Sequence, residues 1–426
     1  MLIYITNRKL TNIPKDASAF NTIDEVGIKL NKKRNASGDA IFCGISNKSY
    51  TKVEFFPRGK ELDLFDKVDV GEYSKPWLVL LHGYHQDAKE TIAKAKFLVD
   101  NHGVNVVLFS WPSRPNPVKS FNTKSLEDYI KDYIKSVLFK FGRPSLLTLF
   151  VGELKKWLED YVSNYVPARN NAEASAGDFY SALSILNEHL LPRLQGKKIS
   201  MVVHSMGNYL LENTIINKNG LPITFKNIIL HQADVNSSNH ANWTPRLSNH
   251  ITNKLYVTIN IFDYVLAASN ILHRYKLNKK NVERLGQSVR IKPDGVYQGY
   301  IHNIVDYLDF TDGYGVDEKH EIFTCKGVSI DNNWISAGKN NIDISIFNLL
   351  GKIFRSETKD GLPTKKGGAL NGISKMKTLP NVFKPEWIVE DESLSEEHED
   401  ISFIYSLEHF TDPYKPEHVD DPDLDD

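Results

Sequence analysis

The stretch ISMVVHSMGNYL, residues 199–210, decides the fold of this chain. Its first five residues, ISMVV, are typical of a strand buried on both faces, and the segment NYLLENTIINKN (208–219) is compatible with a helix. Such a strand-to-helix turn lifts a serine Oγ out of the sheet and aims the next N–H group at an oxyanion. Ser205 is therefore a candidate nucleophile and the Met206 amide a candidate oxyanion donor. A serine that simply ends a buried strand would give the same local pattern.

Six more runs of β-branched and aromatic residues predict strands: LIYIT (2–6), WLVLLHG (77–83), VNVVLFSW (104–111), KNIILHQAD (226–234), LYVTINIFD (255–263) and IVDYLDF (304–310). Helical patterns lie between them, among them DAKETIAKAKFLVDNH (87–102) and SAGDFYSALSILNEHLLPRL (175–194). Alternating strands and helices indicate an α/β fold with a doubly wound, mostly parallel sheet. We predict one core in two parts, residues 1–113 and 173–330.

Residues 114–172 interrupt this alternation. Two apolar stripes at helical spacing, one from Leu126 to Leu138 and one from Leu147 to Tyr165, predict an inserted pair of amphipathic helices. Because the insertion follows the carboxyl end of a strand, where open α/β sheets place ligands, it could form a cap or lid. Its aromatic content favours an apolar acyl or aryl group in the substrate. Both stripes could equally pack on the body.

The chain after residue 330 carries no recognisable chemistry. Residues 331–389 form an expected C-terminal extension, and residues 390–426 hold 15 Asp or Glu against one Lys. This composition predicts a solvated, disordered acidic tail. The alternative is that the tail folds back over the basic remainder of the chain. A protein partner could bind through the insertion or the tail.

The composition excludes several classes of protein. Cys43 and Cys325 lie far apart, and no pattern of metal-ligand spacing occurs, so we expect no disulfide framework, no metal and no cofactor. No secretory signal and no apolar run of about 18 residues is present, which predicts a cytoplasmic protein without a transmembrane segment. The excess of Lys in the body is scattered and no recognised binding motif accompanies it, so no nucleic-acid partner is expected.

Two further positions complete a candidate site around Ser205. The strand WLVLLHG ends at His82-Gly83-Tyr84, upstream of the serine, where hydrolases of this architecture keep the second oxyanion N–H group. This pattern indicates the Tyr84 backbone amide as that donor. An acid that orients a histidine is expected at the end of a later strand, and Asp263 is preferred over Asp234 because it lies two strands after the serine.

A histidine that could act as the base follows the last predicted strand. His320 lies in the loop TDGYGVDEKHEIF, so the chain order Ser, Asp, His could form a compact triad. His204 adjoins the serine, but alternation along the strand points it to the opposite face, which favours a structural role. The competing histidines are His240, His273 and His302.

These residues resemble a family of bacterial α/β-hydrolases of unknown function. The shared motifs are ITNRKL (5–10), HGY (82–84), FSWPS (109–113), VHSMGN (203–208) and KHEIF (319–323). The chain departs from the family pattern at Val203, where Ala or Gly is usual, and at Lys319, where Gly precedes the histidine. The resemblance implies an α/β-hydrolase fold and a Ser-Asp-His triad, carried here by Ser205, Asp263 and His320.

Two functions from different classes follow. The first is a serine hydrolase that transfers an acyl group from a small-molecule ester or related acyl compound, in which every role of the site is filled. The second is a hydrolase-like binding or signalling protein with a vestigial triad. Val203 and the unmatched C-terminal third motivate the second hypothesis.

Overall fold

The computed structural model describes residues 1–8, 10, 19–22, 41–114, 164–275, 283–287, 305–311, 313, 315–316, 319–328, 340–357 and 382–383. Most of the expected insertion and the whole acidic tail lie outside these residues. The first apolar stripe, Leu126 to Leu138, is among the residues left out, and of the second only Tyr165 is described.

The described residues contain one 11-stranded sheet in the order β13-β10-β9-β8-β7-β5-β6-β1-β3-β4-β2. Its parallel part has strands β1 (Leu2–Thr6), β5 (Trp77–Leu81), β6 (Asn105–Ser110), β7 (Ile199–His204), β8 (Phe225–His231), β9 (Ile251–Ile259), β10 (Val305–Asp309) and β13 (Val382–Phe383). An antiparallel edge follows β1 with β3 (Phe42–Ser46), β4 (Lys52–Phe55) and β2 (Ala19–Thr22). The predicted doubly wound, mostly parallel sheet is confirmed.

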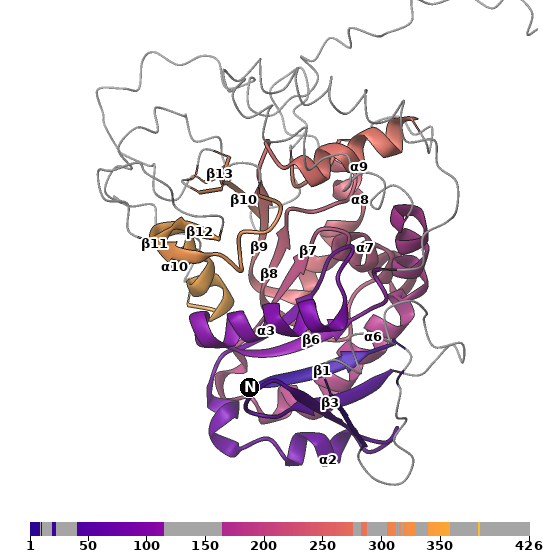
Figure 1. Cartoon of the computed structure of the whole chain (residues 1–426), viewed down its shortest axis with the longest axis vertical. Coiled ribbons are helices and arrows are strands. Elements are labelled where there is room, and N and C mark those ends of the chain that lie inside the picture. The colour runs from indigo at the N-terminus through magenta and orange to yellow at the C-terminus, as the bar shows by residue number, and fades with distance from the viewer. Residues whose placement is uncertain are drawn as a thin grey trace, which may run out of the picture.

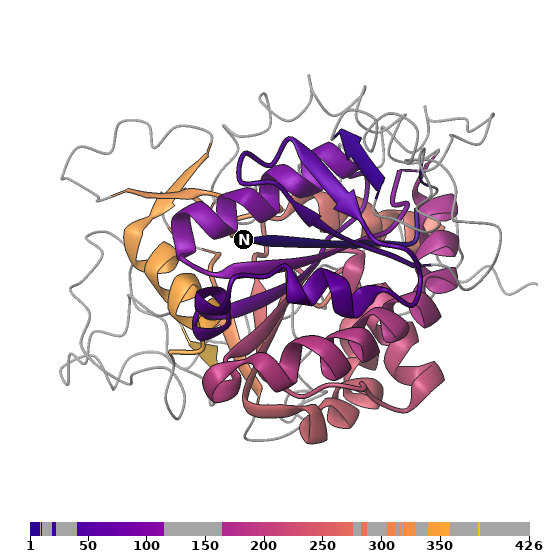
Figure 2. The same cartoon turned by 90° about the horizontal axis from the view of Figure 1, so that it is seen from below.

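Helices cover both faces of the sheet (Figures 1 and 2). Successive residues of a strand point to opposite faces, and the buried residues accordingly separate into two clusters. Met201 and Val203 of β7 pack in one cluster, and Val202 packs in the other. Since both faces are covered, the strands are apolar at nearly every position, which is the reason their runs are visible in the sequence.

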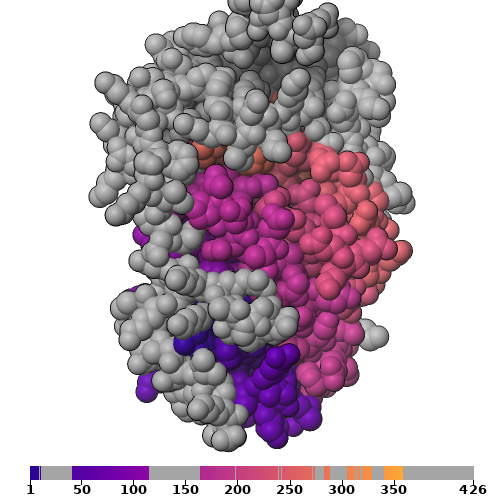
Figure 3. All heavy atoms as spheres, turned by 90° about the vertical axis from the view of Figure 1, so that its right-hand side faces the viewer, coloured from indigo at the N-terminus to yellow at the C-terminus, as the bar shows by residue number. Residues whose placement is uncertain are grey.

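The helices divide between these two faces. The described helices include α2 (Glu61–Asp66), α3 (Ala88–His102), α6 (Ala176–Ile185), α7 (Gly207–Lys218), α8 (His240–Trp243), α9 (Tyr264–Tyr275) and α10 (Ile344–Phe354). Apolar residues of α3 and α10 pack on one face, and those of α2, α6, α7 and α9 pack on the other. Helices α6 and α7 lie on the right-hand side of Figure 1, and Figure 3, which views this side, shows residues from the middle of the chain next to residues of the amino-terminal part.

Helix α3 shows how local sequence sets these elements. The Asp87 side chain accepts a hydrogen bond from the Glu90 amide, and the Glu90 side chain accepts one from the Asp87 amide, which forms a capping box. Gly103 ends the helix in the left-handed conformation with φ 65°. The predicted helix over 87–102 therefore forms with almost the expected bounds.

Part of the expected C-terminal extension packs against the sheet. Strands β11 (Lys326–Val328) and β12 (Asn341–Asp343) form a small parallel pair, and α10 follows them. The Asn227 Nδ2 donates to the carbonyl oxygen of Ile353 at 2.9 Å, and Ile353 is fully buried. Residues 340–357 thus contribute to the cluster of buried residues that also holds α3.

The strand order fixes where a ligand can bind. Strand β6 lies on one side of β5 and β7 lies on the other, so the order in which successive strands are added to the sheet reverses at β5. In open α/β sheets the crevice at such a reversal, outside the carboxyl ends of the strands, is the usual binding site. The segments after β5 and β7, which contain Gly83 and Ser205, lie at this point.

Candidate active site

Ser205 occupies a strained turn between β7 and α7. Its φ of 52° is in the left-handed region, which a residue with a Cβ rarely adopts. The turn is held because the Ser205 amide donates to the His231 carbonyl oxygen at 3.0 Å, and the Ser205 carbonyl oxygen accepts from the amides of Asn208 and Asp234. The Asn208 side chain adds hydrogen bonds to the carbonyl oxygens of Val203 and Ser205.

Two glycines let the neighbouring loop approach this turn. A Cβ atom on Gly83 would lie 2.7 Å from the Ser205 Cβ, and one on Gly207 would lie 2.7 Å from the His82 carbonyl oxygen. Real Cβ contacts are not this short, so both positions require glycine. Val203, which replaces the smaller residue of the usual motif, is fully buried in β7 opposite Leu81 and Leu230, and the turn forms with it in place.

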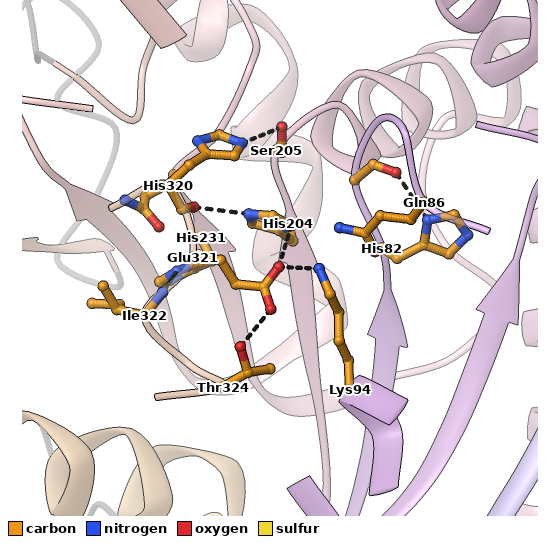
Figure 4. A network of polar contacts seen from close by, with 12 residues as sticks. His82, Gln86, Lys94, His204, Ser205, His231, His320, Glu321, Ile322 and Thr324 are labelled. Atoms are coloured by element: carbon orange, nitrogen blue, oxygen red, sulfur yellow. Dashed lines mark hydrogen bonds and ion pairs between the residues drawn. The ribbon is translucent and has the colours of Figure 1, made fainter. Parts of the chain in front are cut away.

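The structure brings Ser205, His320 and Asp263 into one hydrogen-bonded chain. The Ser205 Oγ lies 2.7 Å from His320 Nε2, and the Asp263 Oδ2 lies 2.6 Å from His320 Nδ1. The other oxygen of Asp263 accepts from the amides of Val265 and Leu266, both at 3.0 Å, at the start of α9. A carboxylate acceptor leaves Nδ1 as the protonated nitrogen of a neutral ring, so Nε2 can accept the serine proton. Figure 4 shows His320 extending toward Ser205.

Burial distinguishes the three side chains. Ser205 is 2% exposed and Asp263 is fully buried, whereas the side chain of His320 keeps 14% of its surface exposed. Burial raises the pKa of the Asp263 carboxyl, and the charge of His320 and the amides of α9 act in the opposite direction.

Asp234, the alternative acid, belongs to a different cluster. Its carboxylate accepts from the Tyr165 hydroxyl at 2.8 Å and from the Ser269 hydroxyl at 2.5 Å, and the Arg284 guanidinium lies 3.7 Å away. Burial raises the pKa of the Asp234 carboxyl, but Arg284 and the other neighbouring groups together hold this pKa below its usual value. Asp234 therefore orders the loop after β8 and does not contact His320.

The competing histidines have other partners. The His240 Nε2 lies 2.8 Å from the Tyr307 hydroxyl, and the His273 Nδ1 lies 2.9 Å from the Ser269 carbonyl oxygen. Burial lowers the pKa of His240 to about 4 and that of His273 to about 3. Both rings are therefore neutral structural groups near pH 7. His302 lies outside the described residues.

The loop that carries Tyr84 is braced by residues after β6. The His82 ring stacks on the Trp111 ring at 5.5 Å, its Nε2 accepts from the Trp111 amide, and its Nδ1 donates to the Gly83 carbonyl oxygen. The Trp111 indole N–H donates to the His82 carbonyl oxygen at 2.9 Å. Ser113 accepts from the Gln86 amide and donates to the Gln86 carbonyl oxygen. The FSWPS motif thus fixes the backbone of the HGY loop.

The TNR motif at the amino terminus braces the same loop. Arg8 is fully buried, and its guanidinium donates to the Gln86 carbonyl oxygen at 3.0 Å and to the Ser110 hydroxyl at 2.9 Å. The Thr6 hydroxyl donates to the Ser110 carbonyl oxygen. Burial lowers the pKa of Arg8 to about 10, which leaves the guanidinium charged. Three motifs that are distant in the sequence therefore meet around residues 82–86.

The two amides expected to bind an oxyanion adjoin Ser205. Met206 is the N-cap of α7, and amides at the beginning of a helix lack partners within it. Tyr84 follows Gly83, whose Cα faces the Ser205 Cβ, and the Tyr84 ring packs at 5.6 Å from the Tyr165 ring. The 83–84 peptide and the Met206 amide thus flank the serine.

A family model described as an alpha/beta hydrolase of unknown function (DUF900) matches residues 69–318, more than half of the chain. The chain belongs to this family. The matched range includes the segments after β5, β7 and β9, and His320 lies two residues beyond it. No curated protein and no solved structure matches the chain significantly.

Several residues that hold the site in this alpha/beta hydrolase were not predicted from the sequence. Gln232 and Asn260 donate to the carbonyl oxygen of Lys319, which precedes the candidate base. Lys94 of α3 forms an ion pair with Glu321, the residue that directly follows the candidate base His320. A polar residue directly after a buried strand could have marked Gln232 and Asn260, whereas nothing in the sequence connects Lys94 with residue 321.

Neither a metal-binding cluster nor a membrane-spanning helix occurs in the described part of this chain. No group of three or more His, Cys, Asp or Glu side chains in that part is arranged to hold a metal ion. None of its helices is both long and apolar enough to cross a membrane. Cys43 and Cys325 are both buried free thiols.

Proposed function

We propose that this protein is a serine hydrolase that cleaves a carboxylic ester or a related acyl bond. The hydrogen-bonded chain from the Ser205 hydroxyl through His320 to Asp263 is the observation that supports the proposal most directly. Membership of an alpha/beta hydrolase family supports hydrolysis as the class of reaction. In this proposal Ser205 is the nucleophile, His320 is the general base and acid, and Asp263 orients His320.

The proposed reaction has two halves. The Ser205 Oγ attacks the acyl carbon while its proton moves to His320 Nε2, and the carbonyl oxygen becomes an oxyanion between the Tyr84 and Met206 amides. The intermediate then collapses, the bond to the leaving alcohol breaks, and His320 gives its proton to that alcohol. Water repeats the sequence on the acyl-enzyme, which releases the carboxylic acid and restores the Ser205 hydroxyl. Every step uses groups of this chain and the two substrates.

The site is suited to this charge separation. Asp263 is fully buried next to His320, so its carboxylate can stabilise the imidazolium that forms when the serine proton is transferred. The strained φ of Ser205 keeps the Oγ at the end of the sheet, and the braced 82–86 loop holds the Tyr84 amide without reorganisation during the reaction. We also propose that the acyl group is apolar, on the ground of the aromatic residues in the sequence of 114–172.

A fluorophosphonate probe tests this function without knowledge of the natural substrate. The probe phosphonylates an activated serine, so intact mass should increase by one adduct in the wild type and in Ser181→Ala. The control variant removes an exposed serine of α6. The adduct should be absent in Ser205→Ala, and turnover of p-nitrophenyl esters should fall by several orders of magnitude in that variant.

The same experiment separates the proposal from a vestigial site. A folded wild type that acquires no adduct, or a Ser205→Ala variant that is labelled as fast as the wild type, would contradict the proposed hydrolase. The first of these outcomes would favour the binding or signalling hypothesis, and a search for partners of the insertion and tail would follow. Circular dichroism of each variant shows whether the fold is retained.

A further inference from the structure

The loop that carries His320, residues 319–325, is held by side chains from several elements. On the side of β8 and β9, the carbonyl oxygen of Lys319 accepts from Gln232 Nε2 at 2.6 Å and from Asn260 Nδ2 at 2.9 Å. After His320 the chain turns into the core, where Ile322 and Phe323 pack with residues of α3. The position of the imidazole therefore depends on backbone contacts at residues 319–321.

His204 supplies one of these contacts. Its Nε2 lies 2.9 Å from the carbonyl oxygen of His320, and because a carbonyl only accepts, Nε2 carries the proton. The His204 ring is 2% exposed, and burial together with the charges of His320 and Lys94 holds its pKa well below the usual value. His204 is thus a neutral donor that supports the backbone of His320 from the face of α3.

Lys94 holds the same segment through the side chain of Glu321. The Lys94 ammonium, on α3, forms an ion pair with the Glu321 Oε2, and the Thr324 hydroxyl donates to Oε1 at 2.5 Å. The Glu321 Oε2 also lies 3.8 Å from the His204 Nδ1. The two charged side chains are only 20% and 17% exposed, so solvent screens this pair less than a surface pair. Figure 4 shows Lys94 reaching up to Glu321 beside His204.

We propose that Lys94, Glu321 and His204 form a clamp that positions the His320 imidazole against Ser205. This inference rests on the proposed hydrolase function. The three residues do not touch the Ser205 Oγ or the Asp263 carboxylate, so they are positioning residues. Displacement of a reacting group by about 1 Å can lower a rate by about 100-fold, which makes the support of this one backbone segment important.

The clamp also controls the charge near His320. The ionisable groups around the imidazole are Asp263 from the segment before α9, His204 from β7 and His231 from β8, with the Lys94–Glu321 pair next to His204. Lys94 and Glu321 cancel each other as a pair. Removal of Lys94 leaves a carboxylate that favours protonated His320, and removal of the Glu321 charge leaves an ammonium that disfavours it.

These opposite charges give a result that loss of rigidity alone would not produce. His320 must be neutral to accept the serine proton, so labelling by a fluorophosphonate should decline on the acidic side of its pH profile. In Lys94→Met this acidic limb should move to higher pH, and in Glu321→Gln it should move to lower pH. In the double variant the limb should return toward its position in the wild type.

The experiment measures the labelling rate at saturation and the probe concentration for half-saturation, at several pH values. Both single variants should lower the saturating rate by roughly 10- to 100-fold and leave the half-saturating concentration almost unchanged. Lys94→Arg, which keeps the charge, should restore most of the rate. The matched controls are Lys96→Met and Asp100→Asn, because Lys96 and Asp100 form an exposed ion pair on the same helix.

Hydrogen exchange of the peptide that covers residues 319–328 gives a readout that does not need a reactive serine. Exchange should be faster in Lys94→Met than in Lys96→Met. Equal exchange in these two variants, or acidic limbs that move in the same direction in Lys94→Met and Glu321→Gln, would overturn the clamp. If the wild type is not labelled at all, the hydrolase proposal fails, and the exchange comparison still decides whether the clamp holds the loop.

Discussion

At the scale of single residues, the site depends on the absence of a side chain at Gly83, as it does at Gly207. The backbone of Gly83 lies so close to the Ser205 Cβ that a methyl group there would overlap it. This contact joins the loop after β5 to the turn after β7. It therefore sets the distance between the Tyr84 amide and the serine, on which oxyanion binding would depend.

Gly83→Ala should consequently impair the site more than the fold. We expect the free energy of unfolding to fall by about 1–3 kcal/mol, as is typical of overpacking, and the fluorophosphonate labelling rate to fall by at least about 10-fold. The control is Gly177→Ala in α6, where a Cβ meets no atom within 4 Å. That variant should keep the wild-type rate. A Gly83→Ala protein that is labelled at the wild-type rate would show that the approach of the loop does not matter.

The sequence could indicate Ser205, Asp263 and His320 as candidates because each lies in the segment that follows a strand recognisable as a buried apolar run: Ser205 directly after β7, Asp263 between β9 and α9, and His320 in the loop after β10. Their mutual distances required the fold. Lys94 could not be found in this way, because it is 227 positions from Glu321 and its helix also carries other lysines, such as the exposed Lys96. Residue patterns report burial and local geometry, and they do not report which distant charge a lysine meets.

At the scale of elements, the limits of local residue patterns explain which strands and helices were predicted from the sequence and which were not. The seven strands predicted from their apolar runs all form. The short antiparallel strands β3 and β4 were not predicted, because FCGIS and KVEF are only five and four residues long and neither is a continuous apolar run. The pattern of NIDISIFNLLGKIF (341–354) is compatible with a strand or a helix, and the segment forms β12 followed by α10. Tertiary packing of its apolar face decides between the two.

Helix α10 should therefore contribute to the stability of the core although it follows all three candidate site residues in the chain. Ile353 is fully buried in the cluster that also holds α3, so Ile353→Ala should lower the free energy of unfolding by about 2–5 kcal/mol. Ile344, at the start of the same helix, is 37% exposed, and Ile344→Ala should cost less than about 1 kcal/mol. Urea denaturation of both variants compares them. Equal losses would mean that α10 does not dock as described.

At the scale of the whole molecule, the described part of the core contains several buried imidazoles. Burial is the main cause that lowers the pKa of each, to about 4 for His102 and His240 and to about 3 for His231 and His273. His82 and His204 are lowered in the same way. Below pH 6.5 the unfolded chain binds protons at these positions and the folded protein does not.

This difference predicts that the protein is sensitive to acid. Because the pKa of each imidazole is lower in the folded state, the contribution of that group to stability is complete above about pH 6.5. This contribution is lost as the pH falls toward the pKa of the group in the folded protein, by up to about 1.4 kcal/mol per pH unit for each group. The raised pKa values of Glu212, Asp263 and Asp306 offset part of this loss. Urea unfolding between pH 7.5 and 4.5 should therefore show stability that falls by several kcal/mol per pH unit below pH 6.

His102 allows the prediction to be tested at one position. It is 2% exposed at the end of α3 and stacks on the Phe347 ring of α10 at 4.4 Å, so His102→Phe keeps a ring in the same place. Any cost of the larger ring is independent of pH, whereas removal of the titrating group should reduce the slope by up to about 1.4 kcal/mol per pH unit. The stability of the variant relative to the wild type should therefore rise steadily from pH 6.5 to about pH 4. Parallel curves for the two proteins would mean that His102 binds protons equally in both states, and that burial does not keep this imidazole neutral.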